Sequence, residues 1–234
     1  MEYGAELVTR SYPISAILNA KLGYGWTLWG ATGDDAVMYG YLKPELKVST
    51  LGSYNSGLLQ VQVFPISFLG FIVGAETVSS SANYPAYDCV TYRCTGKSWQ
   101  TFVEANLVLG VGPVFLIGRA GVEDWHQAPD QDRDFINSNY GLALKQQGDR
   151  VSFAGGVTGY KLDEEWMILY SYMWLQAHEI KGQSQTNLAL VQWSSGDWKL
   201  LGGVGSFESE LKNKQTTVFL RLKWNASGPS PHGY

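Results

Sequence analysis

The sequence predicts an all-β fold, an antiparallel up-and-down β-barrel of about twelve strands that crosses a membrane. Three observations predict it. Only 16% of the residues are charged, against an average of about 25%. Aromatic residues are plentiful (9 Trp, 14 Tyr and 9 Phe), and the mean hydropathy is only −0.12. A membrane barrel combines an apolar outer face with a polar inner face, so its mean hydropathy resembles that of a soluble protein.

The last clear strand, Thr216–Trp224, shows the predicted pattern of alternation. Side chains alternate between the two faces of a strand, so every second residue shares a face. One face is apolar and ends in an aromatic residue, and consists of Thr216, Val218, Leu220, Leu222 and Trp224. The other face carries the charges, and consists of Thr217, Phe219, Arg221 and Lys223.

Similar runs, rich in β-branched and aromatic residues and separated by turn clusters, occur along the whole chain. We expect strands at Ala16–Leu28, Ala36–Leu42, Leu46–Tyr54, Leu58–Phe64, Ser67–Val78, Trp99–Leu109, Val114–Glu123, Ser138–Gln146, Val151–Tyr160, Trp166–Ala177, Thr186–Trp193, Trp198–Phe207 and Thr216–Trp224. These are about thirteen candidates, whereas bacterial single-chain membrane barrels have an even number. Either one candidate is wrong or Tyr3–Arg10 supplies another strand. We predict twelve strands, with fourteen as the alternative.

Two apolar stretches are long enough to suggest helices but are better explained as hairpins. Val48–Ala75 carries no charge, yet Gln60, Gln62 and Pro65 interrupt it, and proline is tolerated at turns and strand edges. The second stretch, Ala105–Gly118, is centred on Gly110-Val111-Gly112-Pro113. No helix is expected in the chain.

The second hairpin permits a prediction of register. If Val111 and Gly112 form the turn, Leu109 lies opposite Val114 on one face, and Glu104 lies opposite Arg119 on the other. Opposite charges across a strand pair contribute roughly 0.2–1 kcal/mol. We interpret Glu104 and Arg119 as a charge pair inside the barrel, and the alternative is a surface ion pair on a soluble sheet.

The strand Trp166–Ala177 predicts aromatic girdles at the membrane boundaries. Trp166, Tyr170, Tyr172 and Trp174 share a face, together with Ile168. Eight residues span roughly 26 Å along a strand, and a tilt of about 40° reduces this to about 20 Å along the membrane normal. We expect these residues and Trp224 to face lipid or a second protomer.

The opposite face of the same strand is also apolar, with Met167, Leu169, Ser171, Met173 and Leu175. A water-filled pore has a polar lining. Either this part of the lumen is packed shut, or the strand contacts another protomer or trapped lipid on its second side.

The long loops are polar and lie at Ser79–Ser98, Trp125–Asn137, His178–Gln185 and Glu208–Gln215. The first contains the two cysteines, Cys89 and Cys94, whose spacing does not fit a zinc site. A local disulfide in an oxidising compartment is the favoured reading, and two free cysteines are the alternative. Long and short connections alternate, as in barrels with outer loops and inner turns, except near Lys161–Glu165.

The ends of the chain and its charge limit location and partners. No basic region followed by an apolar run is present at Met1, so we expect this methionine to be a start added to a mature, exported chain. Residues 1–224 are expected to form the barrel and residues 225–234 a disordered tail. The net charge of −4 and the lack of any Lys/Arg run argue against nucleic acid as a partner.

Catalytic and metal-binding patterns are weak. The histidines are His126, His178 and His232, no Gly-x-Ser-x-Gly occurs, and no serine is convincingly placed relative to a histidine. Asp130, Asp132 and Asp134 alternate but lack the other features of a calcium loop. We expect solvated loop histidines, no catalytic residues, no metal and no cofactor, and so a protein that is not an enzyme.

The aromatic-ended closing strand and the repeated alternation resemble bacterial outer-membrane β-barrels of the porin type. The apolar strands with two apolar faces resemble, more weakly, the ring-forming, lipid-enclosing porin-like proteins of predatory bacteria. The resemblance implies a location in the bacterial outer membrane and membrane lipid as a partner. It also implies that the protein forms homo-oligomers, of which a ring is one form. The implied role is structural: the protein organises the membrane by contacting or enclosing lipid. The tail after Trp224 departs from the family pattern.

Two alternatives remain from the sequence. The first is a small diffusion pore in which Glu104, Arg119, Lys145 and Arg221 set selectivity, with Lys223 as a further charge in the lumen. The second is a soluble β-sandwich whose exposed Trp and Tyr side chains stack on carbohydrate.

Overall fold

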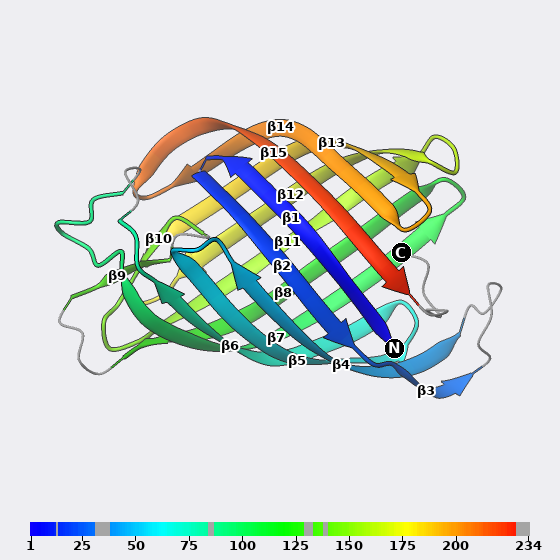
Figure 1. Ribbon diagram of the computed structural model, residues 1–234, viewed down its shortest axis with the longest axis horizontal. Coiled ribbons are helices and arrows are strands. Elements are labelled where there is room, and N and C mark those ends of the chain that lie inside the picture. The colour runs from blue at the N-terminus through cyan, green and yellow to red at the C-terminus, as the bar shows by residue number, and fades with distance from the viewer. Residues whose placement is uncertain (13, 31–37, 84–86, 129–132, 138–139, 228–234) are drawn as a thin grey trace.

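The computed structural model describes residues 1–12, 14–30, 38–83, 87–128, 133–137 and 140–227, and these form a closed antiparallel β-barrel (Figure 1). Twelve strands make the wall, and their bounds follow. They are β1 (Glu2–Ser11), β2 (Ile14–Gly23), β4 (Tyr39–Thr50), β5 (Tyr54–Ile66), β6 (Leu69–Ser80), β7 (Gly96–Val111), β8 (Val114–Gln127), β11 (Asp149–Lys161), β12 (Trp166–Ala177), β13 (Gln183–Ser195), β14 (Trp198–Ser209) and β15 (Lys212–Ser227). The predicted all-β barrel of twelve strands is confirmed.

The wall closes because β1 pairs with both β2 and β15, and β2 in turn pairs with β4. Glu2 lies opposite Ser227, so both ends of the barrel sequence lie at one end of the barrel, here called the terminal end. The opposite end, here called the loop end, carries the connections at 81–95, 128–148 and 178–182 (Figure 1). Within the described residues, no helix is long and apolar enough to span a membrane.

The predicted count of twelve is right, but three of the predicted strands are divided differently. Ala16–Leu28 was expected as one strand, whereas β2 ends at Gly23 and a separate short strand begins at Trp26. Ala36–Leu42 and Leu46–Tyr54 were expected as two strands, whereas β4 runs through Pro44 without a break. Proline cannot donate to a ladder. Here it lies opposite Tyr24–Gly25, the break between β2 and β3 (Trp26–Gly30), and the Pro44 carbonyl accepts the Tyr24 N–H at 3.2 Å. The missing donor therefore costs no ladder bond.

The predicted wall strand Ser138–Gln146 is also wrong. Its centre forms β10 (Leu142–Leu144), which pairs only with β9 (Phe135–Asn137) in a short hairpin inside the loop between β8 and β11. The predicted extra strand Tyr3–Arg10 is instead present as β1. With this exchange, Lys161–Glu165 contains a short turn at the terminal end. The alternation of long and short connections is nevertheless incomplete, because only three residues join β4 to β5 and only two join β14 to β15 at the loop end. The long loop predicted at Glu208–Gln215 is therefore wrong.

The end of β15 departs from the expected domain boundary. β15 continues to Ser227, three residues beyond the predicted end of the barrel at Trp224, and Asn225 and Ala226 keep pairing with β1. The remaining part of the expected tail, residues 228–234, lies outside the described residues.

Candidate functional site

The lumen at the loop end is filled by the hairpin β9–β10. Leu142 and Leu144 are fully buried and pack against inward-facing residues of the wall. That apolar cluster, here called the plug core, consists of Trp125, Phe135, Leu142, Leu144, Val151, Phe153, Leu175 and Ala177. Inward positions of β8, β11 and β12 are thus covered by an apolar hairpin rather than by water.

The hairpin is tied to the neighbouring loops. The backbone N–H of Ala143 donates to the Glu210 carboxylate at 3.0 Å, and Ile136 donates its N–H to the Arg93 carbonyl at 2.9 Å. Glu210 lies in the turn between β14 and β15, where burial raises its pKa above the usual range. Arg93 precedes Cys94, which forms a disulfide with Cys89, so the predicted local disulfide is confirmed.

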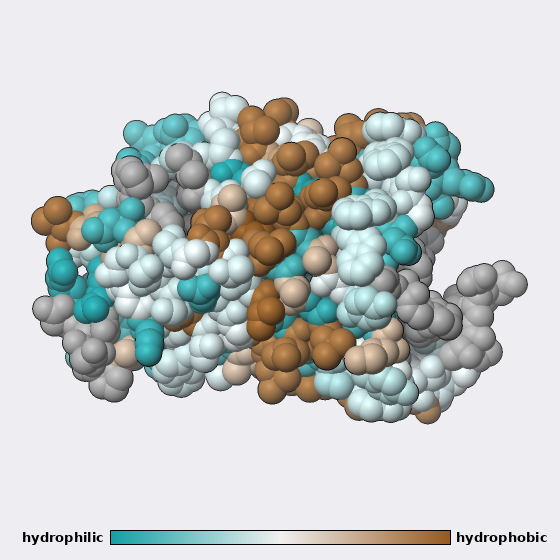
Figure 2. Space-filling view, in the orientation of Figure 1, coloured by the Kyte–Doolittle hydropathy of each residue, from teal (hydrophilic) through white to brown (hydrophobic). Residues whose placement is uncertain are grey.

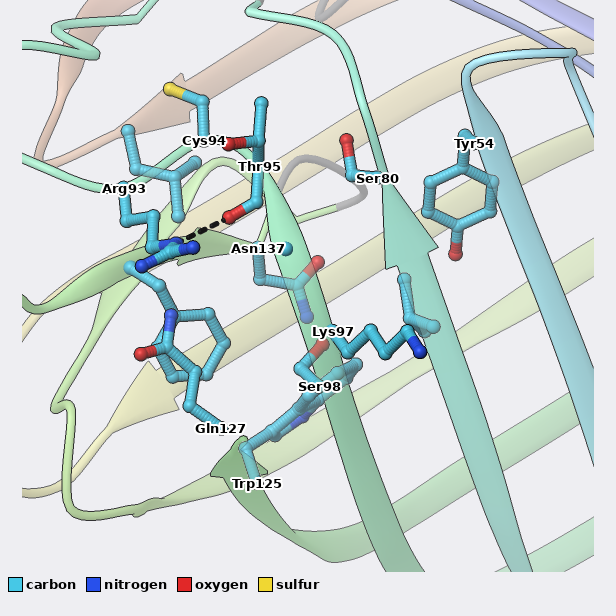
Figure 3. A pocket seen from close by; sticks show the side chains of 14 residues that line it. Tyr54, Ser80, Arg93, Cys94, Thr95, Lys97, Ser98, Trp125, Gln127 and Asn137 are labelled. Carbon is cyan, nitrogen blue, oxygen red and sulfur yellow. Dashed lines mark hydrogen bonds between the residues drawn. The ribbon is translucent and has the colours of Figure 1, made fainter. Parts of the chain in front are cut away.

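A small pocket lies beside the plug, between the disulfide loop and the wall (Figure 3). Its volume is about 30 Å³, which leaves room for only one or two water molecules. Figure 3 shows Arg93 turned toward Thr95, whose carbonyl accepts the Arg93 Nε–H at 2.7 Å. This pocket is too small for a solute.

A second apolar cluster lies deeper in the lumen, toward the terminal end. Leu169, Leu188 and Leu190 are buried there, with Phe115 and Met167 among the residues packed against them. Gly159 on β11 makes room for the Phe115 ring, because an added Cβ would lie 2.3 Å from its Cζ atom. The apolar inner face predicted for Trp166–Ala177 is therefore packed within the barrel.

The other side of the lumen is charged. Glu6 on β1 accepts hydrogen bonds from Arg221 (Nε at 2.7 Å) and from Asn19 (3.0 Å), and its carboxylate lies 3.8 Å from the Lys47 Nζ atom. Lys223 lies opposite Glu6 in the β1–β15 register. Arg221 and Lys223 therefore face the lumen, on the side of the barrel where β1, β2, β4 and β15 meet.

The predicted pairing of Glu104 with Arg119 is wrong in register by two residues. Gly112, with a φ of +57°, and Pro113 form the turn, so Glu104 lies opposite Gly121 and Arg119 opposite Asn106. A shift of two preserves the face, and both charges still point inward. Arg119 lies 6.0 Å from the Phe153 ring centre and 3.9 Å from the Met173 sulfur.

Lys145 does not line the wall as predicted. It follows β10 in the loop, where its Nζ atom lies 3.0 Å from a carboxylate oxygen of Asp134, and its side chain is partly exposed. That ion pair raises the pKa of Lys145. Asp130 and Asp132 lie outside the described residues. Among the described ones, no group of three or more His, Cys, Asp or Glu is placed to hold a metal ion.

The outer face of the wall is apolar and bounded by aromatic rings. Apolar side chains gather across the middle of the face that carries β1, β2 and β15 (Figure 2). Exposed apolar residues continue around the whole outer surface of the wall as an apolar belt, which includes Leu7, Leu18, Leu22, Leu46, Val48, Leu59, Val103, Leu116, Ile168, Val191, Val204, Val218, Leu220 and Leu222. Trp166, Tyr170 and Tyr172 are exposed on the outer face of β12. Trp224 packs edge-on against Tyr3, with the ring centres 5.9 Å apart.

The structure also brings together two residues that the sequence analysis missed. Ser152 on β11 and His178, which follows β12, lie with Oγ and Nε2 2.7 Å apart. The two residues are 26 positions apart in sequence and meet only because β11 and β12 pair. No sequence motif signals such a pair, and only a correct strand register would have found it.

Comparison with known proteins supports the fold. No protein-family model matches the sequence, and no curated protein matches it. Among solved structures, the NanC porin matches with a TM-score of 0.55 at 11% identity, over 95% of this chain and 98% of that chain. The KdgM porin matches with a TM-score of 0.50 at 10% identity, over 96% and 98%.

The chain has the outer-membrane β-barrel fold. A third barrel, LpxR from Salmonella typhimurium, matches with a TM-score of 0.50 at 7% identity, over 96% of this chain and 99% of that chain. The matched structures are bacterial outer-membrane barrels, which supports the predicted location of this barrel in that membrane. That the barrel is not an enzyme stays a prediction.

Proposed function

We propose that this protein is an outer-membrane barrel with a sealed lumen, which organises the membrane through its outer face instead of passing solutes. The plug core carries the proposal. Leu142, Leu144, Val151 and Ala177 are inaccessible to solvent although they lie at the mouth of the barrel. An aqueous pore would leave the mouth wet and its lining polar.

The second apolar cluster supports the same conclusion at a different depth. Leu169, Leu188 and Leu190 would have to leave each other and enter water for a channel to open on that side. Fully exposing a leucine side chain costs about 1.5–3 kcal/mol. Movement of the hairpin alone would therefore not open this side of the lumen.

The outer face of the barrel is the surface that we propose contacts both membrane lipid and a second copy of the same chain. Trp166, Tyr170 and Trp174 present aromatic rings along one strand, beside the apolar belt. We propose that barrels associate through this face and so hold or enclose lipid between them. Native mass spectrometry of the detergent-extracted protein would show an oligomer, and a single monomeric species in several mild detergents would contradict self-association.

A small pore is the second candidate, and the charged side of the lumen favours it. Lys47, Arg221 and Lys223 lie around Glu6 on the inner face of β1, β4 and β15. Glu104, Glu123 and Arg119 lie on the inner face of β7 and β8. Charges of both signs that line a lumen would act on a passing ion. If the protein conducts, Arg119→Glu would shift its ion selectivity.

Conductance in planar bilayers separates the two functions. We expect the intact protein to be closed. We expect a variant with residues 135–144 replaced by a glycine–serine linker of equal length to show flickering, small-conductance openings. Both proteins must first show the altered gel mobility of a folded barrel. Steady openings of the intact protein at the level of the variant would contradict the sealed lumen and favour the pore.

A further inference from the structure

The Ser152–His178 pair lies on the outer face of the barrel, apart from the lumen. Inward positions of β11 include Val151 and Phe153, both buried in the plug core, so Ser152 between them points outward. Its Oγ atom lies 2.7 Å from His178 Nε2, at an exposed position. A serine hydroxyl within hydrogen-bond distance of an imidazole is the arrangement that activates a nucleophile.

The histidine is held in place by the end of β11. The backbone N–H of His178 donates to the Arg150 carbonyl at 2.9 Å and to the Asp149 carboxylate at 3.1 Å. The same carboxylate accepts the N–H groups of Glu179 and Ile180 at 3.0 and 3.3 Å. Asp149 is buried and anchors this loop, so the backbone of His178 has a defined position relative to β11, and the hydrogen bond to Ser152 orients its imidazole.

The depth of the pair matches the boundary between hydrocarbon and headgroups. Ser152 is eight residues from Tyr160, an exposed aromatic residue at the terminal end of the same strand. Eight residues on a tilted strand cover about 20 Å along the membrane normal, close to the ~25 Å height of the apolar band. Trp174 lies one step toward the membrane centre, opposite Ala154, and the ion pair Arg150–Asp124 (2.8 Å) lies one step outward. The ester bonds of membrane lipids lie at this boundary.

We propose that Ser152 and His178 form an esterase site for the acyl esters of membrane lipids. His178 Nε2 takes the proton of Ser152 as Oγ attacks the ester carbonyl carbon. The carbonyl oxygen becomes an oxyanion, and we assign its stabilisation to the guanidinium of Arg150, which lies two residues away on the same face and is paired with Asp124 through Nε. Collapse breaks the ester C–O bond, and His178 returns the proton to the leaving alcohol.

Water completes the cycle. His178 takes a proton from a water molecule, which attacks the acyl group on Ser152, and the serine leaves with that proton as the free fatty acid is released. The net reaction is ester plus water giving alcohol plus acid, without any oxidant or metal. This proposal replaces the expectation of a solvated loop histidine for His178, and with it the expectation that the protein has no catalytic residues and is not an enzyme. It does not depend on whether the lumen conducts.

A fluorophosphonate probe tests the nucleophile. The folded, detergent-solubilised protein is incubated with the probe, and the labelled residue is located by mass spectrometry. We expect one label per chain, on Ser152, with labelling at least tenfold slower in Ser152→Ala and His178→Gln. Ser79→Ala and His126→Gln change a serine and a histidine elsewhere near the loop end and should label like the unaltered protein. Labelling of the unaltered protein no faster than that of Ser152→Ala would overturn the proposal.

Release of fatty acid tests the substrate. The protein is reconstituted in vesicles of phosphatidylethanolamine and phosphatidylglycerol, and free fatty acid is measured over time. We expect release that falls at least tenfold in both Ser152→Ala and His178→Gln, while all variants keep the gel mobility of the folded barrel. Release that is equal in all proteins, or absent from the unaltered one, would overturn the assignment of lipid esters as the substrate.

Discussion

Replacing Leu144 by aspartate is expected to release the hairpin β9–β10 from the lumen. Leu144 is 0% exposed and packs in the plug core, where nothing in the cluster can pair with a carboxylate. Burying an unpaired charge costs about 3–5 kcal/mol. We therefore expect the hairpin to leave the lumen, because the aspartate is then solvated instead of buried. The twelve wall strands hold each other through their ladders and should remain folded.

Hydrogen exchange measured by mass spectrometry reports this release directly. Amides of Phe135–Asn137 and Leu142–Leu144 should lose about 100-fold or more of their protection, while those of β12 and β13 keep theirs. Leu162→Asp is the matched control, because Leu162 lies exposed in the turn between β11 and β12 and should change nothing. Unchanged protection of the hairpin in Leu144→Asp would show that the plug core is not packed as described.

Replacing Val204 by arginine is expected to destabilise the barrel in a bilayer by about 2–4 kcal/mol. Val204 is 56% exposed on the outer face of β14, and it is six residues from Trp198 at the terminal end. Six residues cover roughly 15 Å along the membrane normal, close to the midplane of the apolar band. An arginine at this position would lie in the hydrocarbon of the bilayer. If the same face were exposed to water, the substitution would leave the free energy of unfolding almost unchanged.

Reversible urea unfolding in lipid vesicles measures the change. Val90→Arg makes the same substitution at an 84% exposed position in the disulfide loop, outside the predicted apolar band, and should cost less than about 1 kcal/mol. A soluble sheet would tolerate both arginines equally. Equal unfolding free energies for the two variants in vesicles would therefore contradict the lipid-facing assignment of β14.

The wall of the barrel could be predicted because alternation is a local property of each strand. Trp166–Ala177 was predicted with the bounds that the structure has, since its aromatic outer face and its flanking turn residues agree. Pro44 misled the prediction, because a proline ends most strands. β4 tolerates Pro44 because the residue lies opposite the break at Tyr24–Gly25, between β2 and β3. That break can be recognised only once the strands are paired.

The contents of the barrel could not be predicted in the same way. The segment Leu142–Leu144 is apolar and prone to form a strand, and these properties suit a wall strand and a strand inside the lumen equally. Only its burial among Val151, Leu175 and Ala177 shows that it lies in the lumen. The predicted register between β7 and β8 was wrong by two residues, because Val111–Gly112 and Gly112–Pro113 are both acceptable as the two turn residues. Ser152 and His178 required the β11–β12 pairing before their proximity could be seen.

Gel mobility in SDS tests the central claim most directly, by comparing unboiled and boiled samples of detergent-extracted protein. A closed barrel that crosses the membrane resists SDS until it is heated, so we predict a clear difference in migration between the two samples. Stable oligomers would add a larger band before boiling. Identical migration, from a protein that is soluble in plain buffer, would contradict the membrane barrel and favour a soluble β-sandwich.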